Sequence, residues 1–306
     1  MNMKRILNVA CLLLLTFSLR AQNDPQYSQY LFNKLVINPA YAGSTGELSL
    51  RMMSRWQWVG FQNAPKTQTA SFHMPTADLR HGVGINFVMD RLGHTRSRLF
   101  NVNYAYRIPI GSGHLGIGLN MGFKQFSLLL GDLTEEVFDP VFAYQDQHLM
   151  TFVAGPGLYY QNEFFYAGAS MPYIMPGKLE KIYAIPGSVS KLPKSVYLMG
   201  GAAIPVGEAV KLRPSIMLRV TPRLPIGLDL GLGAMFKDRI FVGSIWRPGN
   251  SLVMQLQTFI TPKLQLGYSY DLTLKEIGQY TSGSHEVMLG LDLNVHRADN
   301  ASPVRF

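Results

Sequence analysis

Residues 26–43 read QYSQYLFNKLVINPAYAG, the only long motif in the sequence that does not have the pattern of a strand. Asp24 and Pro25 precede this stretch, as an N-cap residue followed by proline at the first helical position. Asn38 lies directly before Pro39, which pushes its backbone out of the helical region and ends a helix there. Apolar side chains recur at helical spacing between these two signals, at Tyr27, Tyr30, Leu31 and Leu35. The stretch therefore predicts a short amphipathic helix over residues 26–36, followed by a rigid turn into a sheet.

The chain beyond this stretch alternates apolar and polar residues, which is the pattern of β-strands with two different faces. The clearest example is residues 287–295. Gly290, Asp292 and Asn294 point to one face of this strand. Its other face carries Val287, Leu289, Leu291, Leu293 and Val295.

Connection lengths decide what kind of sheet these strands form. About fourteen strand-like segments of roughly ten residues follow residue 47. Links after even-numbered strands are mostly tight, whereas long links follow odd-numbered strands at residues 59–66, 127–148, 172–194 and 272–284. A β-sandwich has no reason to sort its loops in this way, but a membrane barrel does. The sequence predicts an all-β fold, a transmembrane antiparallel β-barrel of about 14 strands, similar to FadL-type and other outer-membrane barrels, with a short N-terminal helical segment.

Composition fits one large barrel domain. The chain has 306 residues, 15% of them charged, with 29 Gly and 15 Tyr. No long apolar run follows residue 20, which argues against a helical membrane protein. We expect a signal peptide at residues 1–21 and a barrel domain at 22–306. Within that domain, residues 22–44 form the N-terminal helix and turn motif, 45–296 the strands, and 297–306 a tail.

The first 21 residues are typical of a secretory signal peptide. Lys4 and Arg5 supply the charged start, an apolar segment follows, and Ala21 precedes the expected cleavage point. The single cysteine, Cys11, lies inside this segment, so the mature protein is expected to lack disulfides. Cleavage of the signal peptide and export to the outer membrane are predicted.

The net charge of +9 falls by three when the basic residues of the signal peptide are removed. The remaining basic residues are scattered over turns and strand ends, at positions such as Lys237, Arg239 and Lys263. No basic helix or stripe typical of a nucleic-acid-binding protein is present. Contact with anionic headgroups of outer-membrane lipid is the better interpretation, and no nucleic-acid partner is predicted.

Two further features describe the expected barrel. Its polar face carries many glycines, which predicts a roomy lumen, and the helix at residues 26–36 is a candidate to fill the periplasmic mouth. Aromatic residues gather near strand ends, where interfacial girdles would lie. These residues are Trp56, Trp58, Phe61, Trp246, Tyr268 and Tyr270.

Residue patterns that could support catalysis or metal binding have simpler explanations. GSGHLG at residues 111–116 fits a dinucleotide-binding pattern, but a strand follows it instead of a helix, so it predicts a hairpin turn. The histidines lack metal-ligand spacing. Glu135, Glu136 and Asp139 form an acidic cluster that is best explained as part of a solvated loop. No enzyme, cofactor or metal site is predicted.

Residues 26–43 resemble the opening of the PorP/SprF family, outer-membrane components of the type IX secretion system. That family begins with a Gln-rich, Pro-containing segment, a Tyr-Met/Leu-Phe-Asn core and then Asn-Pro-Ala-Tyr-Ala-Gly. Here the core lies at residues 29–33 and the second motif at residues 38–43. The resemblance implies a barrel that serves type IX secretion, in some members gliding motility. It also implies other secretion components and secreted cargo proteins as partners.

Two functions remain open at this point. The first is a non-enzymatic secretion component that acts by protein–protein interaction, and the second is a FadL-like channel for a hydrophobic small solute. A soluble exported sandwich is a third, less favoured reading. An apolar pocket in the lumen would favour the channel, and cargo choice is expected in the connections at residues 127–148 and 172–194. The residues expected to plug the periplasmic end or to dock a partner are Tyr27, Tyr30, Leu31, Asn33, Leu35, Asn38, Pro39, Ala40, Tyr41 and Gly43.

Overall fold

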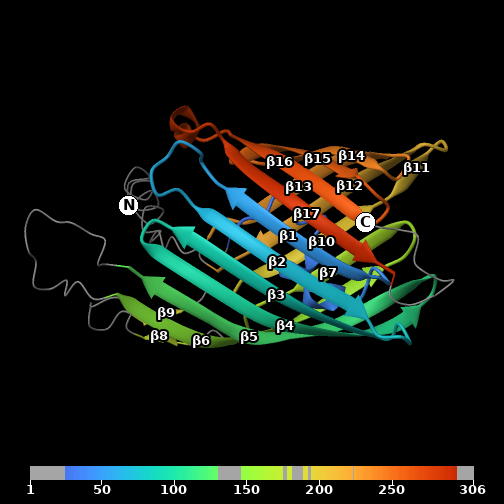
Figure 1. Ribbon diagram of the computed structural model, residues 1–306, viewed down its shortest axis with the longest axis horizontal. Helices are drawn as coiled ribbons and strands as arrows, with labels where there is room; N and C mark the ends of the chain where they lie inside the picture. The colour runs from blue at the N-terminus through green and yellow to red at the C-terminus, as the bar shows by residue number, and fades with distance from the viewer. Residues whose placement is uncertain are drawn as a thin grey trace, which may run out of the picture.

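The computed structural model describes residues 25–129, 146–174, 178–180, 189–191, 194–222 and 224–294. Within these residues, fourteen antiparallel strands close into one barrel (Figure 1). The predicted fold class is therefore confirmed. None of the helices in the described residues is long and apolar enough to cross a membrane.

The first half of the barrel follows chain order, each strand pairing with the next. Its seven strands are β1 (Leu48–Trp56), β2 (Lys66–Pro75), β3 (His81–Leu92), β4 (Thr95–Ile110), β5 (Gly113–Leu128), β6 (Gln147–Gln161) and β7 (Phe165–Ser170).

The second half returns to the first strand, because β1 pairs with the last strand and closes the ring. β10 pairs with both β7 and β12, and after a break at Ala203 the short β11 continues the same edge along β12. The elements are β10 (Val196–Ala202), β11 (Ile204–Val206), β12 (Val210–Val220), β13 (Gly227–Phe236), β14 (Ile240–Arg247), β15 (Ser251–Phe259), β16 (Leu264–Thr273) and β17 (Ser284–Leu293).

The two faces of the wall differ as the alternation predicts. On β5, Ile117, Leu119 and Met121 are 43–48% exposed on the outside, whereas Asn120 between them is 3% exposed and faces the lumen. On β17, Leu289 points outward and Asp292 points inward. The outer face is thus an apolar surface suited to lipid, and the inner face is polar.

The connections differ in length between the two ends of the barrel, as predicted. We call one end the short-connection end; its links lie at residues 76–80, 111–112, 162–164, 207–209, 237–239 and 260–263. The opposite, long-connection end carries the links at residues 57–65, 129–146, 171–195 and 274–283, together with three shorter ones. The 171–195 connection was predicted as a loop. The structure adds a small hairpin there, β8 (Lys178–Glu180) with β9 (Val189–Lys191).

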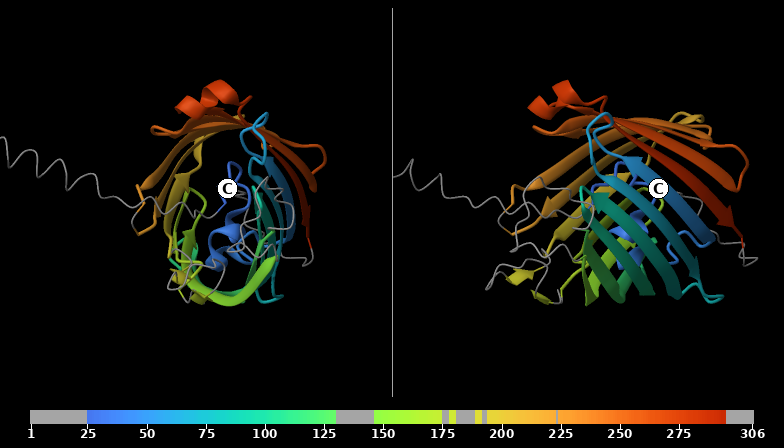
Figure 2. Two further views of the ribbon diagram at one scale, coloured as in Figure 1. Left: turned by 90° about the vertical axis from the view of Figure 1, so that its left-hand side faces the viewer. Right: turned by 60° about the vertical axis from the view of Figure 1, so that its left-hand side comes forward.

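A segment that is not part of the wall runs through the lumen. Figure 2 shows it as the blue chain enclosed by the ring of strands, and we call residues 25–46 the plug. The sequence predicted a continuous amphipathic helix over residues 26–36. The helical segment is smaller: two 3₁₀ turns, η1 (Lys34–Val36) and η2 (Pro39–Tyr41). A third 3₁₀ helix, η3 (Glu276–Tyr280), lies in the last long connection.

The expected amphipathic stripe is absent because the plug is buried on all sides. Polar Gln29 and Lys34 are as fully buried as their apolar neighbours Tyr30 and Leu35. Side chains of the barrel wall bond to carbonyl groups of the plug backbone, which satisfies these groups without a regular helix. Propensity alone would have predicted a helix here, but the tertiary contacts overrode it.

The position of the plug also corrects an expectation. It was expected at the periplasmic mouth, but it runs along the lumen from one end to the other. Ser28 contacts Arg55 and Glu286, both beside the long connections. Gly43 lies against Pro75 and Gly82, which flank a link of the short-connection end. The plug therefore enters from the long-connection half and leaves into β1 at the opposite end.

Several sequence predictions fall outside the described residues. They are the signal peptide at 1–21, the acidic cluster Glu135, Glu136 and Asp139, the last strand residue Val295 and the tail at 297–306.

Candidate functional site

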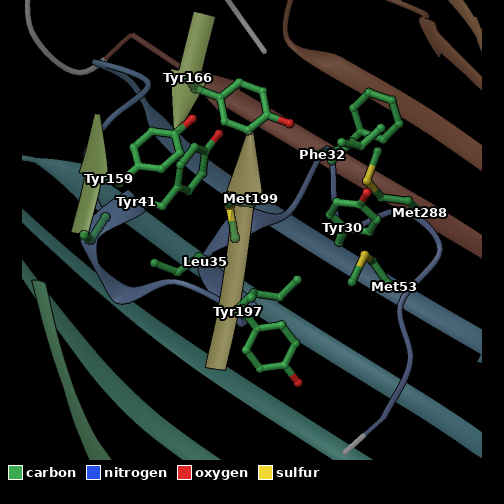
Figure 3. Close-up of a cluster of buried hydrophobic side chains, with 14 of the residues drawn as sticks. Tyr30, Phe32, Leu35, Tyr41, Met53, Tyr159, Tyr166, Tyr197, Met199 and Met288 are labelled. Atoms are coloured by element: carbon green, nitrogen blue, oxygen red, sulfur yellow. The ribbon is translucent and has the colours of Figure 1, made fainter. Parts of the chain in front are cut away.

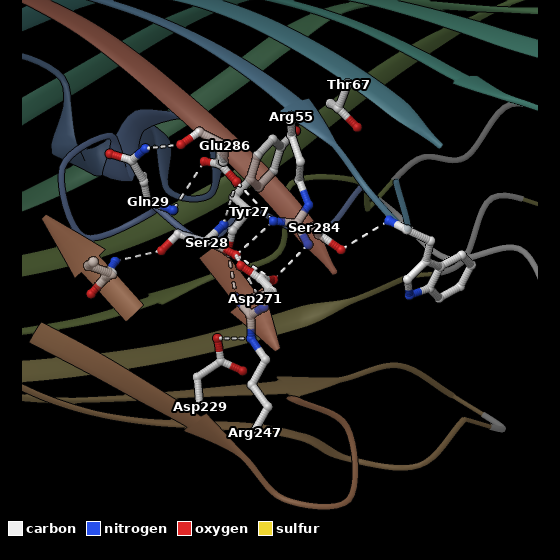
Figure 4. A network of polar contacts seen from close by, with 12 residues as sticks. Tyr27, Ser28, Gln29, Arg55, Thr67, Asp229, Arg247, Asp271, Ser284 and Glu286 are labelled. Carbon is white, nitrogen blue, oxygen red and sulfur yellow. Dashed lines mark hydrogen bonds and ion pairs between the residues drawn. The ribbon is translucent and has the colours of Figure 1, made fainter. Parts of the chain in front are cut away.

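The start of the plug is held by a cluster of charged side chains around Ser28 (Figure 4). The backbone N–H of Ser28 donates to Glu286 Oε2 at 2.8 Å, and the N–H of Gln29 donates to Oε1 of the same carboxylate at 3.1 Å. Ser28 Oγ donates to Asp271 at 2.8 Å and accepts from Arg55 Nη1 at 2.8 Å. We call Ser28, Arg55, Arg247, Asp271 and Glu286 the Ser28 latch.

The charges in the latch compensate one another. Arg55 pairs with Asp271 at 2.7 Å and with Glu286 at 3.3 Å. Arg247 pairs with Asp271 at 2.9 Å and with Asp229 at 3.0 Å, and it also donates to the carbonyl of Tyr27. These side chains are almost fully buried, so removing one of them leaves a remaining buried charge with fewer partners to compensate it.

A second charged anchor lies further along the lumen. Arg51 donates to both carboxylate oxygens of Asp292, at 2.8 and 2.9 Å, in the bidentate geometry that strengthens such pairs. The same guanidinium donates through Nε to the carbonyl of Phe32 at 3.3 Å. Ser49 Oγ also donates to Asp292 at 2.6 Å. The pair thus connects β1, β17 and the plug.

The middle of the plug packs as an apolar core inside the barrel (Figure 3). Phe32 meets Phe241 edge to face, with ring centroids 5.1 Å apart. Tyr41 meets Tyr159 in the same manner at 5.2 Å, and Tyr159 stacks on Tyr166 at 5.9 Å. Tyr30, Leu35, Met53, Met199 and Met288 belong to the same cluster. A lumen lined mostly by polar residues therefore encloses a hydrophobic core to which the plug and the wall both contribute.

Lys34 is a cation buried in this core. It is 1% exposed, and its Nζ donates to the carbonyl of Leu31 at 2.6 Å. The same nitrogen lies 4.6 Å from the ring centre of Tyr166 and 5.4 Å from that of Tyr41. Burial, with smaller contributions from the charges of Arg213 and Arg51, lowers the pKa of Lys34 to about 7. Lys34 belongs to η1 and to no membrane-spanning strand.

Side chains from many strands bind the plug backbone. Plug side chains reach the wall as well; Asn33 Nδ2, for example, donates to Ser71 Oγ at 2.9 Å. Five further bonds run from wall side chains to plug carbonyl groups. They are Asn86 to Leu35 at 2.9 Å, Ser170 to Ile37 at 2.8 Å, Arg107 to Gly43 at 3.1 Å, Gln161 to Ser44 at 2.7 Å and Gln255 to Ser28 at 2.7 Å.

Glycines on the inner face leave space for the plug. A Cβ at Gly118 would collide with the backbone of Ala40, and one at Gly82 would collide with the carbonyl of Ala42. A Cβ at Gly157 would overlap the side chain of Asn38. Some of the glycines that predicted a roomy lumen are therefore positions where the wall contacts the plug.

The Asn38–Pro39 step turns the plug at these glycines. Asn38 Oδ1 accepts the N–H of Ala40 at 3.0 Å and caps η2, while its Nδ2 donates to the carbonyl of Leu158 at 2.9 Å. Gly43 has φ of 71°, a left-handed conformation that glycine adopts without strain. Its N–H contacts His73 Nδ1 at 3.3 Å.

Little space remains in the middle of the lumen. A cavity of about 30 Å³ lies near Phe32, Arg51 and Asp292, enough for about one water molecule. A larger, polar cavity of about 430 Å³ opens at the long-connection end, beside Gln26 and Arg219. Among the described residues, no group of His, Cys, Asp or Glu is placed to hold a metal ion.

All ten residues predicted for the plug or docking motif lie together in the lumen. Sequence reasoning missed Ser28, Gln29, Phe32 and Lys34, which are equally buried. Arg51, Arg55 and Glu286 were missed as well. A signal for these wall residues existed, because each falls on the polar face of its strand, where a charge needs a partner.

Comparison with known proteins gives one family. The model of the family described as "Type IX secretion system membrane protein PorP/SprF" matches residues 19–291. Among solved structures, the Ralstonia pickettii toluene transporter TbuX is similar, with TM-score 0.51, 11% identity, and coverage of 86% of this chain and 93% of that one. The P. putida toluene transporter TodX is also similar, with TM-score 0.48, 11% identity, and coverage of 90% and 95%. No curated protein matches the chain. The likeness to TbuX concerns the barrel fold alone.

Proposed function

Because the chain belongs to the PorP/SprF family of type IX secretion system membrane proteins, we propose that it is a non-enzymatic outer-membrane barrel that supports secretion or surface attachment of cargo proteins. The observation that carries this proposal is the plug. Its apolar core, two charged anchors and bonds from many strands fill the lumen with the protein's own chain. A barrel whose lumen is filled in this way is better suited to serve as a rigid scaffold for protein partners than as a channel for a solute.

The partners in this proposal are other components of the secretion system and secreted cargo, gliding adhesins among them. The plug motif is buried, so its contribution is to fix the wall and the ends of the strands. The connections at the long-connection end, including 127–148 and 172–194, would then choose the cargo. Cleavage of the signal peptide after Ala21 belongs to the same proposal.

The competing proposal is a FadL-like channel for a hydrophobic small solute. Such a channel needs an apolar pocket with a path to it. The cavity at the long-connection end has Arg55, Arg219, Arg247 and Asp271 on its lining, which suits polar contents. Deeper in the lumen, the plug occupies the place that a solute would need. These two features favour the secretion component.

Deletion of residues 26–35 tests the proposal. The shortened chain is expected to insert in the outer membrane, which heat-dependent mobility in SDS gels would show, but to lose secretion of type IX cargo and capture of partners in mild detergent. Normal secretion by the deletion variant would reject a functional plug. Uptake of a hydrophobic solute by the intact protein, with secretion unaffected when the gene is removed, would favour the channel instead.

A further inference from the structure

Four cations lie together on the outer face of the barrel at the long-connection end. Lys66 on β2 is directly opposite Arg91 on β3, and Arg91 is directly opposite Arg96 on β4. Arg98 follows two positions after Arg96 and therefore shares its face. Directly opposed side chains in an antiparallel pair have Cβ atoms about 5 Å apart. The four cations thus form one compact patch across three strands.

Nothing in the described structure neutralises this patch. The side chains of Lys66, Arg91 and Arg98 are exposed and that of Arg96 is half-buried. Among the residues that the structure describes, none of these four side chains forms an ion pair or a hydrogen bond. Like charges directly opposite each other destabilise a sheet. The arrangement has a cost that a bound anion would remove.

The patch is confined to one side of the barrel. On the opposite side, the outer face at the same end carries Trp246, Leu252, Tyr270 and Leu272. Arg247 is the one lysine or arginine in β13, β14, β15 and β16, and it is buried in the latch. The cations are therefore a localised site and not part of a basic girdle.

An apolar surface adjoins the patch on the membrane side. Phe100 lies two positions beyond Arg98, about 7 Å along the strand. It belongs to a row of aromatic side chains that crosses four strands. The row is Phe87, Phe100, Phe123 and Phe152, each 38–48% exposed. The charged and apolar surfaces are thus only one or two residues apart along the strand. A lipid has the same arrangement, with a charged headgroup next to apolar acyl chains.

A cavity lies on the other side of the patch, beneath a connection between strands. The connection 57–65 folds over the end of β3, where Gly93 N–H donates to the carbonyl of Asn63 at 3.0 Å. Beneath it lies a cavity of about 460 Å³ whose lining includes Trp56, Phe61, Lys66 and Arg91. The space joins two cations with aromatic side chains and has room for a headgroup.

We propose that Lys66, Arg91, Arg96 and Arg98 bind the phosphate groups of an anionic membrane lipid. Guanidinium groups match phosphate oxygens in bidentate geometry, and clustered basic residues beside an apolar surface attract anionic lipid. The acyl chains lie along the phenylalanine row and the headgroup enters the cavity beneath residues 57–65. Long connections lie at the outer surface in barrels of this kind, so the lipid belongs to the outer leaflet.

Lipid binding by native mass spectrometry tests the site. The full chain in detergent micelles is titrated with lipid A carrying two phosphates, with dephosphorylated lipid A and with inorganic phosphate. The triple variant Lys66→Gln, Arg91→Gln, Arg96→Gln is compared with Arg80→Gln, Arg239→Gln, Lys263→Gln, which removes the same charge from exposed positions at the other end. The first variant is expected to bind phosphorylated lipid A about 100-fold more weakly. The second is expected to stay within about twofold of the parent.

Each arm has an outcome that overturns the proposal. Equal binding of the phosphorylated lipid by the first variant and the parent would reject the patch. Equal binding of dephosphorylated lipid A would show that the apolar row alone acts, and equal binding of inorganic phosphate would show a free-anion site. Thermal stability adds a separate measurement: without lipid, the first variant should unfold at the same or a higher temperature than the parent. A lower temperature would mean that the cations support the fold itself.

Discussion

The backbone N–H of Ser28 donates to the carboxylate of Glu286 at 2.8 Å, which joins residues 258 positions apart in the sequence. Ser28 is near the start of the plug, and Glu286 is on the strand that closes the barrel against β1. The bond therefore ties the plug to the strand that closes the barrel. A plug held in this way cannot leave the lumen without uncovering buried charges, which is why we expect the closed, filled barrel to behave as one unit.

The latch can be tested at Asp271, which serves both Arg55 and Arg247. Asp271→Asn keeps the shape but removes the charge, and it should destabilise the barrel by about 3 kcal/mol because breaking a buried pair is costly. Urea unfolding in detergent, followed by tryptophan fluorescence, would measure this.

Asp238→Asn is the matched control for the latch. Asp238 pairs with Lys211 at 2.8 Å, but its side chain is 65% exposed. Its loss should cost about 1 kcal/mol or less. Equal effects of the two substitutions would contradict the importance of the buried latch.

The glycine contacts give a second test. In Gly118→Ala, the new Cβ collides with the backbone of Ala40, so the plug must shift and stability should fall by about 1–3 kcal/mol. Conductance in planar bilayers should rise as the lumen loosens. Gly200→Ala, where the nearest atom is 3.6 Å from the new Cβ, should change neither quantity. An unchanged Gly118→Ala protein would mean that the plug packs elsewhere.

A third test uses the buried cation Lys34, whose pKa burial lowers from 10.5 to about 7. Between these values the unfolded chain binds the proton and the folded chain does not, so stability rises with pH through this range and is lost as pH falls toward 7. The slope from this one group approaches about 1.4 kcal/mol per pH unit.

Lys34→Met isolates that contribution to the pH dependence. Its unfolding free energy should change less between pH 7.5 and 9.5 than that of the parent protein, because methionine cannot titrate. Urea unfolding at both pH values measures the difference. Identical slopes in the two proteins would show that Lys34 stays charged in the lumen.

A fourth test addresses the lipid-facing surface. Val102 is 45% exposed near the middle of β4, and Ile110 is 46% exposed at its end. Val102→Arg should cost about 2–4 kcal/mol and Ile110→Arg about 0–1 kcal/mol, because the cost of a cation depends on its depth in the bilayer. Refolding into lipid vesicles at graded urea concentrations measures both. Equal costs would mean that Val102 does not lie deeper in the bilayer than Ile110.

Much of the wall could be predicted from the sequence because its signal is local. The alternation of Leu289 and Leu291 with Gly290 and Asp292 assigns faces without knowledge of any other strand, and the sorted connections indicate a closed barrel. The plug could be predicted in part. Its motif and its burial were found, but the continuous helix and the periplasmic position were wrong, since both depend on contacts with distant residues.

The sequence by itself determined the fold class, the inward and outward faces and the segment that would not join the sheet, because period-2 alternation and proline placement act over a few residues. Only the tertiary structure decided where that segment lies and what holds it. Ser28 meets Asp271 and Glu286, and Ala40 meets Gly118, only after the ring has closed. The charged patch of Lys66, Arg91 and Arg96 likewise arises from strand register, which brings together residues that look scattered along the chain.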